Sequence, residues 1–339
     1  MTRLRSPEDS VLPDVPASSM AVFQEMDRLG AGRQPFLFII DFELRKPLVI
    51  PQNQVDPRII QYDFRGSRNS TARTFPSTPL QIIKHPVSIE RFGSAFDKVI
   101  AHEKSGNSFL VNLTFRTEIS INPGLEEIFC RSSAPYKLWW RDRLAVFSPE
   151  SFIRIENGLI SAYPMKGTID AGLPDAARRV LCDSKELAEH VTIVDLIRND
   201  LSRVAREVAV TRFRYIDEIT TTQKSLLQVS SRIEGRLEAG YEGQIGQILL
   251  ELLPAGSVSG APKVKTLEII REAEEESRGY YCGVMGLFDG CNLDSGVMIR
   301  YIEQDDGRHW YRSGGGITVN SNMESEYQEM IDKIYVPVD

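Results

Sequence analysis

Three glutamates on two predicted helices have the residue type and spacing of a divalent-cation site. Glu189 lies in a row of helical spacing with Ile193 and Leu196, away from the main apolar stripe of its helix. Glu326 and Glu329 share a helical face because they are three residues apart. Carboxylates suit Mg²⁺, which keeps waters and substrate oxygens among its ligands. Taken singly, Glu189 could instead pair with an arginine, and Glu326 with Glu329 could form a solvated acidic face.

A lysine in a short small-residue segment is the candidate nucleophile. Lys166 lies in PMKGT (164–168), which closes a predicted hairpin and has Gly167 directly after the lysine. Glycine lets the backbone bend towards a substrate, and a desolvated lysine can act as a nucleophile or base. From the motif alone, a surface lysine in a loop is the better interpretation.

Two small-residue segments could bind an anion through their backbone. GSVSGAPK (256–263) runs into a predicted helix, whose exposed N–H groups favour a carboxylate or phosphate. It is not a P-loop, because the GxxxxGK[ST] pattern is absent. SGGG (313–316) follows a predicted strand, where glycines allow close approach to a ligand. Tight turn packing would also explain these glycines.

Strands joined by tight turns must position these residues. Alternating and apolar runs predict strands over residues 35–41 and 109–117. Asn157-Gly158 and Asp306-Gly307 are strong hairpin signals, because a type I′ turn needs positive φ at both central residues. They predict strand pairs 152–156 with 159–163, and 297–304 with 309–313. Such hairpins form antiparallel sheet.

Three helices are predicted from their start signals. Asp183 with Glu186, and Ser321 with Glu324, form capping-box patterns, and Pro262 suits a first helical position. The predicted apolar stripes are Leu187, Val191, Val194, Ile197, Leu201 and Val204 in the first helix, and Met323, Tyr327, Met330 and Ile334 in the third. Hairpins combined with long helices indicate an α+β fold.

The bulk properties favour a globular enzyme. The 339 residues are 42% hydrophobic and 26% charged, and no linker or repeat divides them. We therefore expect a flexible tail over residues 1–18 and one catalytic domain over 19–339. A net charge of −7 argues against a nucleic-acid surface.

The sequence features that bear on cellular location all favour the cytoplasm. No apolar run reaches the roughly 18 residues of a membrane helix, and the N-terminus has no secretory h-region. The four cysteines have no CxxC pairing, so we expect reduced thiols in a cytoplasmic protein.

Together the motifs resemble those of the chorismate-utilising enzymes, the anthranilate, aminodeoxychorismate, isochorismate and salicylate synthases. The matching segments are SPESF (148–152), PMKGT (164–168), KELAEHVTIVDLIRNDLSRVA (185–205), GSVSGAPKVKTLEII (256–270), MIR (298–300), SGGGI (313–317) and ESEYQEMIDK (324–333). The resemblance implies two packed, largely antiparallel sheets flanked by helices, as in anthranilate synthase component I, with a deep site between them.

The resemblance also implies the ligands of that site. Mg²⁺ would bridge the ring carboxylate of chorismate to Glu189 and Glu329, with Glu326 close by. The enolpyruvyl carboxylate would be held by side chains and backbone of the set Tyr281, Arg300, Gly315 and Gly316. The ring carboxylate would lie against the set Gly167, Thr168 and Ser257.

Two positions decide which reaction the resemblance implies. Lys166 matches a lysine of aminodeoxychorismate synthases, component I, where anthranilate synthases usually have alanine. In the family that lysine attacks C2 of the ring and expels the C4 hydroxyl, and ammonia then adds at C4. Glu150 would be the general acid and base. Leu110 stands where isochorismate and salicylate synthases carry a water-activating lysine, which disfavours their reactions.

We therefore expect 4-amino-4-deoxychorismate, a precursor of p-aminobenzoate and folate, to be the product. The segment 227–230 lacks the histidine that anthranilate synthases use in pyruvate elimination, and Ile169-Asp170 replaces a frequent Arg-Pro. A separate glutamine amidotransferase subunit should supply ammonia, because no glutaminase triad is visible. The alternatives are anthranilate synthase component I and a non-catalytic chorismate-binding subunit.

Overall fold

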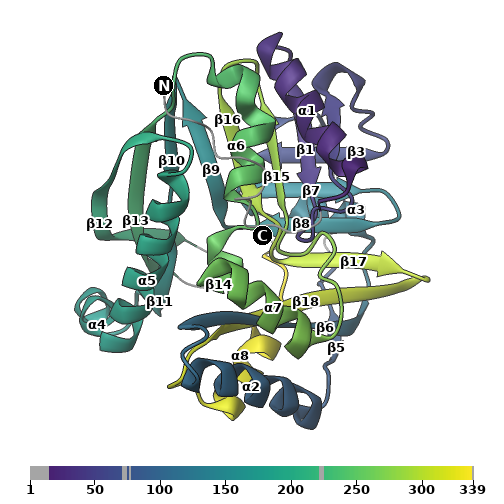
Figure 1. The fold of residues 1–339 in the computed structure, drawn as a ribbon. Helices are drawn as coiled ribbons and strands as arrows, with labels where there is room; N and C mark the ends of the chain where they lie inside the picture. The colour runs from purple at the N-terminus through teal and green to yellow at the C-terminus, as the bar shows by residue number, and fades with distance from the viewer. Residues whose placement is uncertain (1–14, 71–74, 76–77, 221–224, 338–339) are drawn as a thin grey trace.

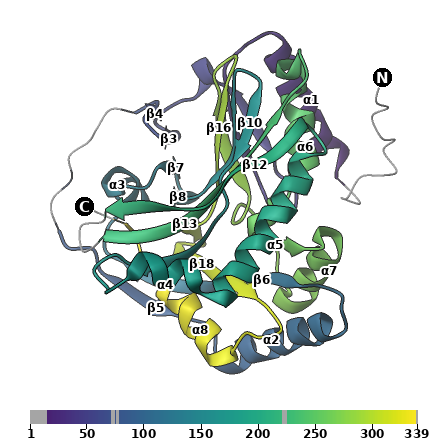
Figure 2. The ribbon, with the colours of Figure 1, turned by 90° about the vertical axis from the view of Figure 1, so that its left-hand side faces the viewer.

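Two nine-stranded sheets form the framework of the protein, and the pairings among its described strands are antiparallel. The structure is a computed structural model that describes residues 15–70, 75, 78–220 and 225–337. Helices flank both sheets, as Figures 1 and 2 show from two sides. The α+β fold with two antiparallel sheets is therefore confirmed.

The first sheet, sheet A, has the order β11, β13, β10, β9, β16, β15, β1, β2, with β12 beside β13. Its strands are β1 (Phe36–Ile40), β2 (Leu48–Pro51), β9 (Ser151–Glu156), β10 (Leu159–Ala162), β11 (Met165–Asp170), β12 (Arg206–Thr220), β13 (Ser225–Arg236), β15 (Val284–Phe288) and β16 (Leu293–Val297).

The second sheet, sheet B, has the order β14, β6, β18, β17, β8, β7, β3, β4, with β5 beside β6. Its strands are β3 (Ile60–Phe64), β4 (Ser67–Arg68), β5 (Ile82–His85), β6 (Leu110–Ile121), β7 (Tyr136–Trp140), β8 (Leu144–Ser148), β14 (Gly260–Ala261), β17 (Tyr301–Asp305) and β18 (Arg308–Ile317).

The helices cover the sheets in groups. They are α1 (Ala17–Ala31), α2 (Ile89–Lys104), α3 (Leu125–Arg131), α4 (Ala176–Cys182), α5 (Ser184–Leu201), α6 (Ile245–Leu252), α7 (Lys263–Glu274) and α8 (Met323–Asp332). Helices α2 and α8 lie together against β6 and β18 (Figure 1). Helices α4 and α5 lie against β11 and β13 (Figure 2). No helix in the described part of the chain is long and apolar enough to cross a membrane.

The main core is shared by both sheets. The fully buried strand FLFII of β1 lies between β15 and β2 in sheet A, and buried residues of β6 and β8 join the same cluster. Burial on both faces explains why β1 is a continuous apolar run rather than an alternating one. This core extends along the chain from Phe23 to Met330.

Both predicted hairpin turns are confirmed. Asn157 and Gly158 have φ of 52° and 78°, and Asp306 and Gly307 have φ of 48° and 75°. The predicted strand over residues 297–304, before the second turn, begins too early. Val297 ends β16 of sheet A and Tyr301 begins β17 of sheet B, so the chain changes sheets between them.

Several helix boundaries differ from the prediction by one or two residues. Helix α1 begins at Ala17, inside the segment predicted as a tail, whose residues 1–14 lie outside the described part. Pro262 precedes α7 with an extended ψ of 140° instead of being its first helical residue. Helix α8 is capped by Asn322, whose side chain accepts a hydrogen bond from Ser325 N, while Ser321 bonds elsewhere.

The predicted apolar stripe of α5 is wrong at its start. Leu187 and Val191 are 38% and 47% exposed, whereas Glu189 is 7% exposed. The N-terminal half of α5 is rotated so that polar side chains face the protein. The Asp183 cap is confirmed, because its side chain accepts a hydrogen bond from Glu186 N.

Candidate active site

A bulge in β11 directs Lys166. Met165 pairs with Ser230 and Thr168 with Gln228, so Lys166 and Gly167 together oppose one residue of β13. Bulges of this kind re-aim a side chain and are common beside active sites. Residues 165–168 of PMKGT thus belong to a strand, not to the closing turn that the sequence suggested.

Glycine is required inside this bulge. Gly167 has φ of 93°, and a Cβ there would lie 3.3 Å from Oε2 of Glu186 and 3.4 Å from Cγ2 of Val180. A larger residue would therefore be strained. Thr168 follows as an exposed residue of the strand.

The side chain of Lys166 ends on helix α5. Its Nζ lies 2.6 Å from Oε2 of Glu189, which is buried. Burial acts to lower the pKa of Lys166, but the charges of Glu189, Glu186 and Glu329 outweigh it and raise the pKa above its ordinary value. Lys166 is therefore an ammonium group, and it interacts with carboxylates of both α5 and α8.

The next residue of α5 supports the strand that carries the lysine. His190 is buried, with Nε2 2.7 Å from Ser231 Oγ. Ser231 N in turn donates to Pro164 O at 3.0 Å, two residues before Lys166. Burial lowers the pKa of His190 to about 4, with the Lys166 backbone acting in the opposite direction. A neutral imidazole thus anchors the start of β11.

Helix α8 brings two carboxylates and a lysine to one glycine of β18. Glu326 Oε2, Lys333 Nζ and Glu329 Oε1 lie 3.3, 3.6 and 3.7 Å from where a Cβ of Gly315 would be. Lys333 Nζ lies 2.7 Å from Glu329 Oε1, and Ser321 Oγ donates to Glu326 Oε1 at 2.8 Å. A side chain at position 315 would fill this polar cradle.

The glycine triplet lies within a strand rather than after one. Gly314, Gly315 and Gly316 pair with Thr114, Leu113 and Asn112 of β6. A Cβ at Gly316 would lie 2.9 Å from Leu110 Cδ1, so Leu110 closes this end of the sheet.

Glu150 and Arg300 lie where the chain passes between the sheets. Glu150 separates β8 of sheet B from β9 of sheet A, and Arg300 separates β16 of sheet A from β17 of sheet B. The two crossings are neighbours, because Val297 N donates to Glu150 O and Phe147 N donates to Arg300 O, each at 3.0 Å.

The carboxyl group of Glu150 is held by a hydroxyl and a cation. Ser257 Oγ donates to Glu150 Oε1 at 2.5 Å. Burial raises the pKa of Glu150, while the Ser257 hydrogen bond and the charge of Arg300 oppose the rise. A carboxyl group with a raised pKa can hold a proton for transfer at neutral pH.

Tyr281 joins Arg300 at the same crossing. The charge of Arg300 acts on the buried Tyr281, whose pKa burial raises well above its ordinary value. The guanidinium of Arg300 also stacks 4.9 Å from the ring centroid of Tyr335. The tyrosines therefore surround a largely buried cation that could bind an anionic ligand.

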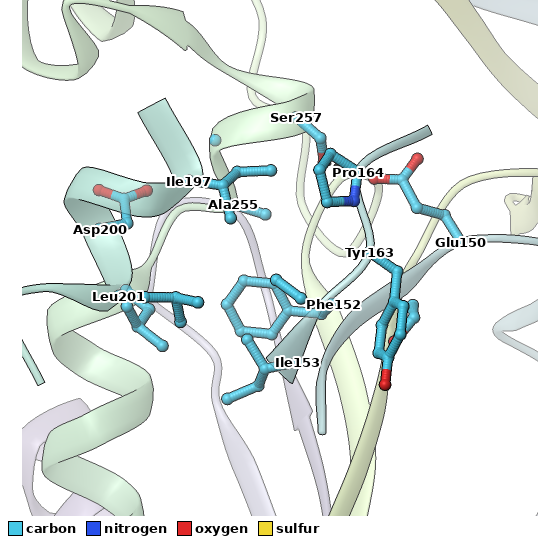
Figure 3. A pocket seen from close by; sticks show the side chains of 14 residues that line it. Glu150, Phe152, Ile153, Tyr163, Pro164, Ile197, Asp200, Leu201, Ala255 and Ser257 are labelled. Carbon is cyan, nitrogen blue, oxygen red and sulfur yellow. Dashed lines mark hydrogen bonds between the residues drawn. The ribbon is translucent and has the colours of Figure 1, made fainter. Parts of the chain in front are cut away.

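A small cavity lies beside Glu150. Phe152, Ile153, Ile197, Leu201 and Ala255 give it a mainly apolar wall, and Glu150, Ser257 and Pro164 lie together at one end (Figure 3). Asp200 lies at the opposite side, where it pairs with Lys263 Nζ at 2.7 Å.

Comparisons with known proteins identify relatives of this chain. Residues 48–339 match the family described as chorismate binding enzymes. Aminodeoxychorismate synthase component 1 of Salmonella typhimurium is 30% identical to this chain. The match covers 96% of this chain and 72% of the relative. The chain belongs to the family of chorismate binding enzymes.

Other similar proteins support this family membership. A PabA-like protein of Pasteurella multocida, described as uncharacterised, is 50% identical over 94% of this chain and 98% of its own length. Anthranilate synthase component I of Streptococcus pneumoniae has a TM-score of 0.65 at 27% identity, covering 76% of this chain and 59% of that one. Menaquinone-specific isochorismate synthase of Escherichia coli has the same fold, with a TM-score of 0.71 at 15% identity.

The donor set of this chorismate binding enzyme is compatible with Mg²⁺ although it is not a closed cage. In the part of the chain that the structure describes, no three His, Cys, Asp or Glu side chains are grouped tightly enough to hold a metal by themselves. Mg²⁺ commonly needs only one or two carboxylates besides waters and substrate oxygens. Glu189, Glu326 and Glu329 supply such oxygens, and lysine ammonium groups now neutralise two of them.

The sequence did not identify Lys333 and His190 as site residues. Lys333 lies one helical turn after Glu329, and that i, i+4 spacing could have indicated the ion pair. His190 gave no comparable signal, because its partner Ser231 is distant in the sequence.

Proposed function

We propose that this protein is the chorismate-aminating component of an aminodeoxychorismate synthase. It converts chorismate and ammonia to 4-amino-4-deoxychorismate, the precursor of p-aminobenzoate in folate synthesis. The observation that supports this most is the Lys166 bulge, which directs an amine at Glu189 within reach of the Glu329 charge.

Each side chain has a defined task in this proposal. Lys166, as the neutral amine formed once its proton has passed to solvent, forms a bond to C2 of the ring. The two conjugated ring double bonds shift, and the C4 hydroxyl leaves with its electron pair. Glu150 donates a proton to that hydroxyl, so that it departs as water. Arg300, Tyr281 and the backbone of β18 bind the enolpyruvyl carboxylate.

The metal has a binding and electrostatic task. Glu189 and Glu329, with Glu326 beside them, would hold Mg²⁺, which when bound supplies positive charge for the ring carboxylate. Gly167, Thr168 and Ser257 complete the surroundings of that carboxylate. Ammonia comes from a separate glutamine amidotransferase subunit.

Anthranilate synthase component I is the second candidate, because relatives with that name match this chain, one at 34% identity over 73% of it. Lys166 and the segment 227–230, which lacks a histidine, favour C4 amination with the enolpyruvyl group retained.

Incubation with chorismate, Mg²⁺ and ammonium distinguishes the candidates. We expect a product that keeps the enolpyruvyl group and gives p-aminobenzoate only after addition of aminodeoxychorismate lyase. Anthranilate fluorescence without the lyase would support the second candidate. Unchanged chorismate would support a non-catalytic binding subunit.

A further inference from the structure

We infer that the cavity beside Glu150 is the binding site for the nitrogen nucleophile, in the form of neutral ammonia. This inference rests on the proposed function and assigns a separate place to its second substrate. The cavity lies between β9, β10, the end of α5 and the turn at residues 255–257 (Figure 3).

The size of the cavity selects the ligand class. About 30 Å³ is open to the centre of a water-sized molecule, and one water needs roughly 10–15 Å³ by the same measure. The space therefore fits one or two molecules of the size of ammonia. It is too small for the ring of chorismate, so the cavity lies beside the ring site and meets it at Glu150 and Ser257.

The walls favour a neutral molecule over a cation. Phe152, Ile153, Ile197 and Leu252 contribute apolar surface, which disfavours an unpaired charge. The carboxylate of Asp200 is engaged by Lys263 at 2.7 Å, so its charge is already compensated. Ammonia can enter such a space, whereas ammonium would lose its hydration without a matching partner.

The end of the cavity meets the candidate catalytic groups. Glu150 and Ser257 line it, and so does Pro164, two residues before Lys166. A molecule in the cavity can therefore reach Glu150 without passing through the Gly315 cradle that Glu326, Glu329 and Lys333 surround.

The chemistry of the second step suits this placement. The ammonia lone pair forms the new bond at C4, and the two conjugated ring double bonds shift. The bond from C2 to the Lys166 nitrogen then breaks and returns its electron pair to that nitrogen. Glu150, left as a carboxylate after protonating the hydroxyl, takes the surplus proton from the new C4 ammonium. Glu150 thereby regains its proton, and Lys166 is released as the neutral amine in which it attacked.

Filling the cavity should obstruct ammonia selectively. Ala255 lines the cavity and is 1% exposed, with an extended backbone that valine accepts. With ammonium as nitrogen source, we expect Ala255→Val to raise the KM for ammonium by at least about tenfold, while the KM for chorismate changes little. Ala95→Val, a buried position on α2 that does not line the cavity, should leave both KM values near those of the wild type.

Enlarging the cavity gives a second measurement, which does not require the protein to fold with a larger side chain in its interior. Ile197→Ala should let methylamine serve as a nucleophile, giving an N-methylated product that mass spectrometry distinguishes from the amino product. The wild-type protein should exclude methylamine.

The outcomes separate the two proposals. The cavity assignment is overturned if folded Ala255→Val has an unchanged KM for ammonium, or if its two KM values rise equally. It is also overturned if folded Ile197→Ala forms no N-methylated product from methylamine. A product that carries a new hydroxyl would mean that the cavity delivers water instead. If the wild-type protein forms no aminated product at all, the proposed function itself fails.

Discussion

Nζ of Lys166 lies 2.6 Å from Oε2 of Glu189, so the candidate nucleophile and a candidate metal ligand form an ion pair. The contact joins a strand bulge to the buried face of α5. It also explains how Glu189 can be buried as a carboxylate, because a lysine distant in the sequence supplies a compensating charge. Release of Lys166 from this pair is required before its nitrogen can attack.

Replacement of Lys166 by alanine should abolish amination at C4 while the protein stays folded. The variant loses the group that forms the bond to C2, whereas the bulge itself depends on Gly167. Product analysis by mass spectrometry and thermal unfolding would be compared with those of the wild type. Wild-type turnover in Lys166→Ala would exclude a covalent lysine step.

Replacement of Glu150 by glutamine should lower kcat by roughly 10²–10⁴-fold, the usual range for a positioned general acid. Because burial raises the pKa of Glu150, its protonated form persists to higher pH than that of an exposed glutamate, and activity should fall on the alkaline side of that pKa. This alkaline limb should be absent from the residual activity of Glu150→Gln.

Ser257 provides a directional test of the same group. The Ser257 hydrogen bond acts to lower the pKa of Glu150. Ser257→Ala should therefore raise that pKa further and move the alkaline limb of the kcat profile to higher pH. A limb that moves to lower pH would contradict the assignment of this pKa to Glu150.

Replacement of Glu329 by glutamine should cause a large loss of activity and weaken the response to Mg²⁺. The variant removes one carboxylate charge from the site around Gly315. Activity would be measured across a Mg²⁺ titration, with Glu324→Gln, an exposed position on the same helix, as the control. A Glu329→Gln enzyme as active as the wild type at low Mg²⁺ would argue against this ligand.

Replacement of Arg278 by methionine should reduce the free energy of unfolding by roughly 3–5 kcal/mol, because it leaves a buried carboxylate without its partner. The fully buried guanidinium bonds Glu274, and also Val258 O and Asn112 O at 2.7 and 2.6 Å. Urea denaturation would measure the change. A loss below about 1 kcal/mol, the range of exposed ion pairs, would mean that the pair contributes little.

The sequence was most informative where structure is local. Asn157-Gly158 predicts its hairpin because the turn's backbone conformation depends on those two residues. Asp183 predicts the start of α5 because a cap acts over three residues. The motif resemblance predicted the family, which the comparisons confirm, and the set of site residues, which remains a prediction.

The features that the sequence did not predict depend on contacts between residues far apart in the sequence. The bulge at Lys166 exists only through the register with β13, which a single strand sequence does not reveal. The apolar spacing of Leu187 and Val191 predicted that they lie on the buried face of α5, but both are exposed. Glu189 and His190 are buried instead, because they contact Lys166 and Ser231. Glu150 and Arg300 came together because the chain changes sheets at both positions.

The most direct test is identification of the product formed from chorismate, Mg²⁺ and ammonium by the wild-type protein, with and without aminodeoxychorismate lyase. We predict a compound with the mass of 4-amino-4-deoxychorismate, which the lyase converts to p-aminobenzoate. Anthranilate formed without the lyase, or chorismate left unchanged, would contradict the assignment of C4 amination to Lys166 and Glu150.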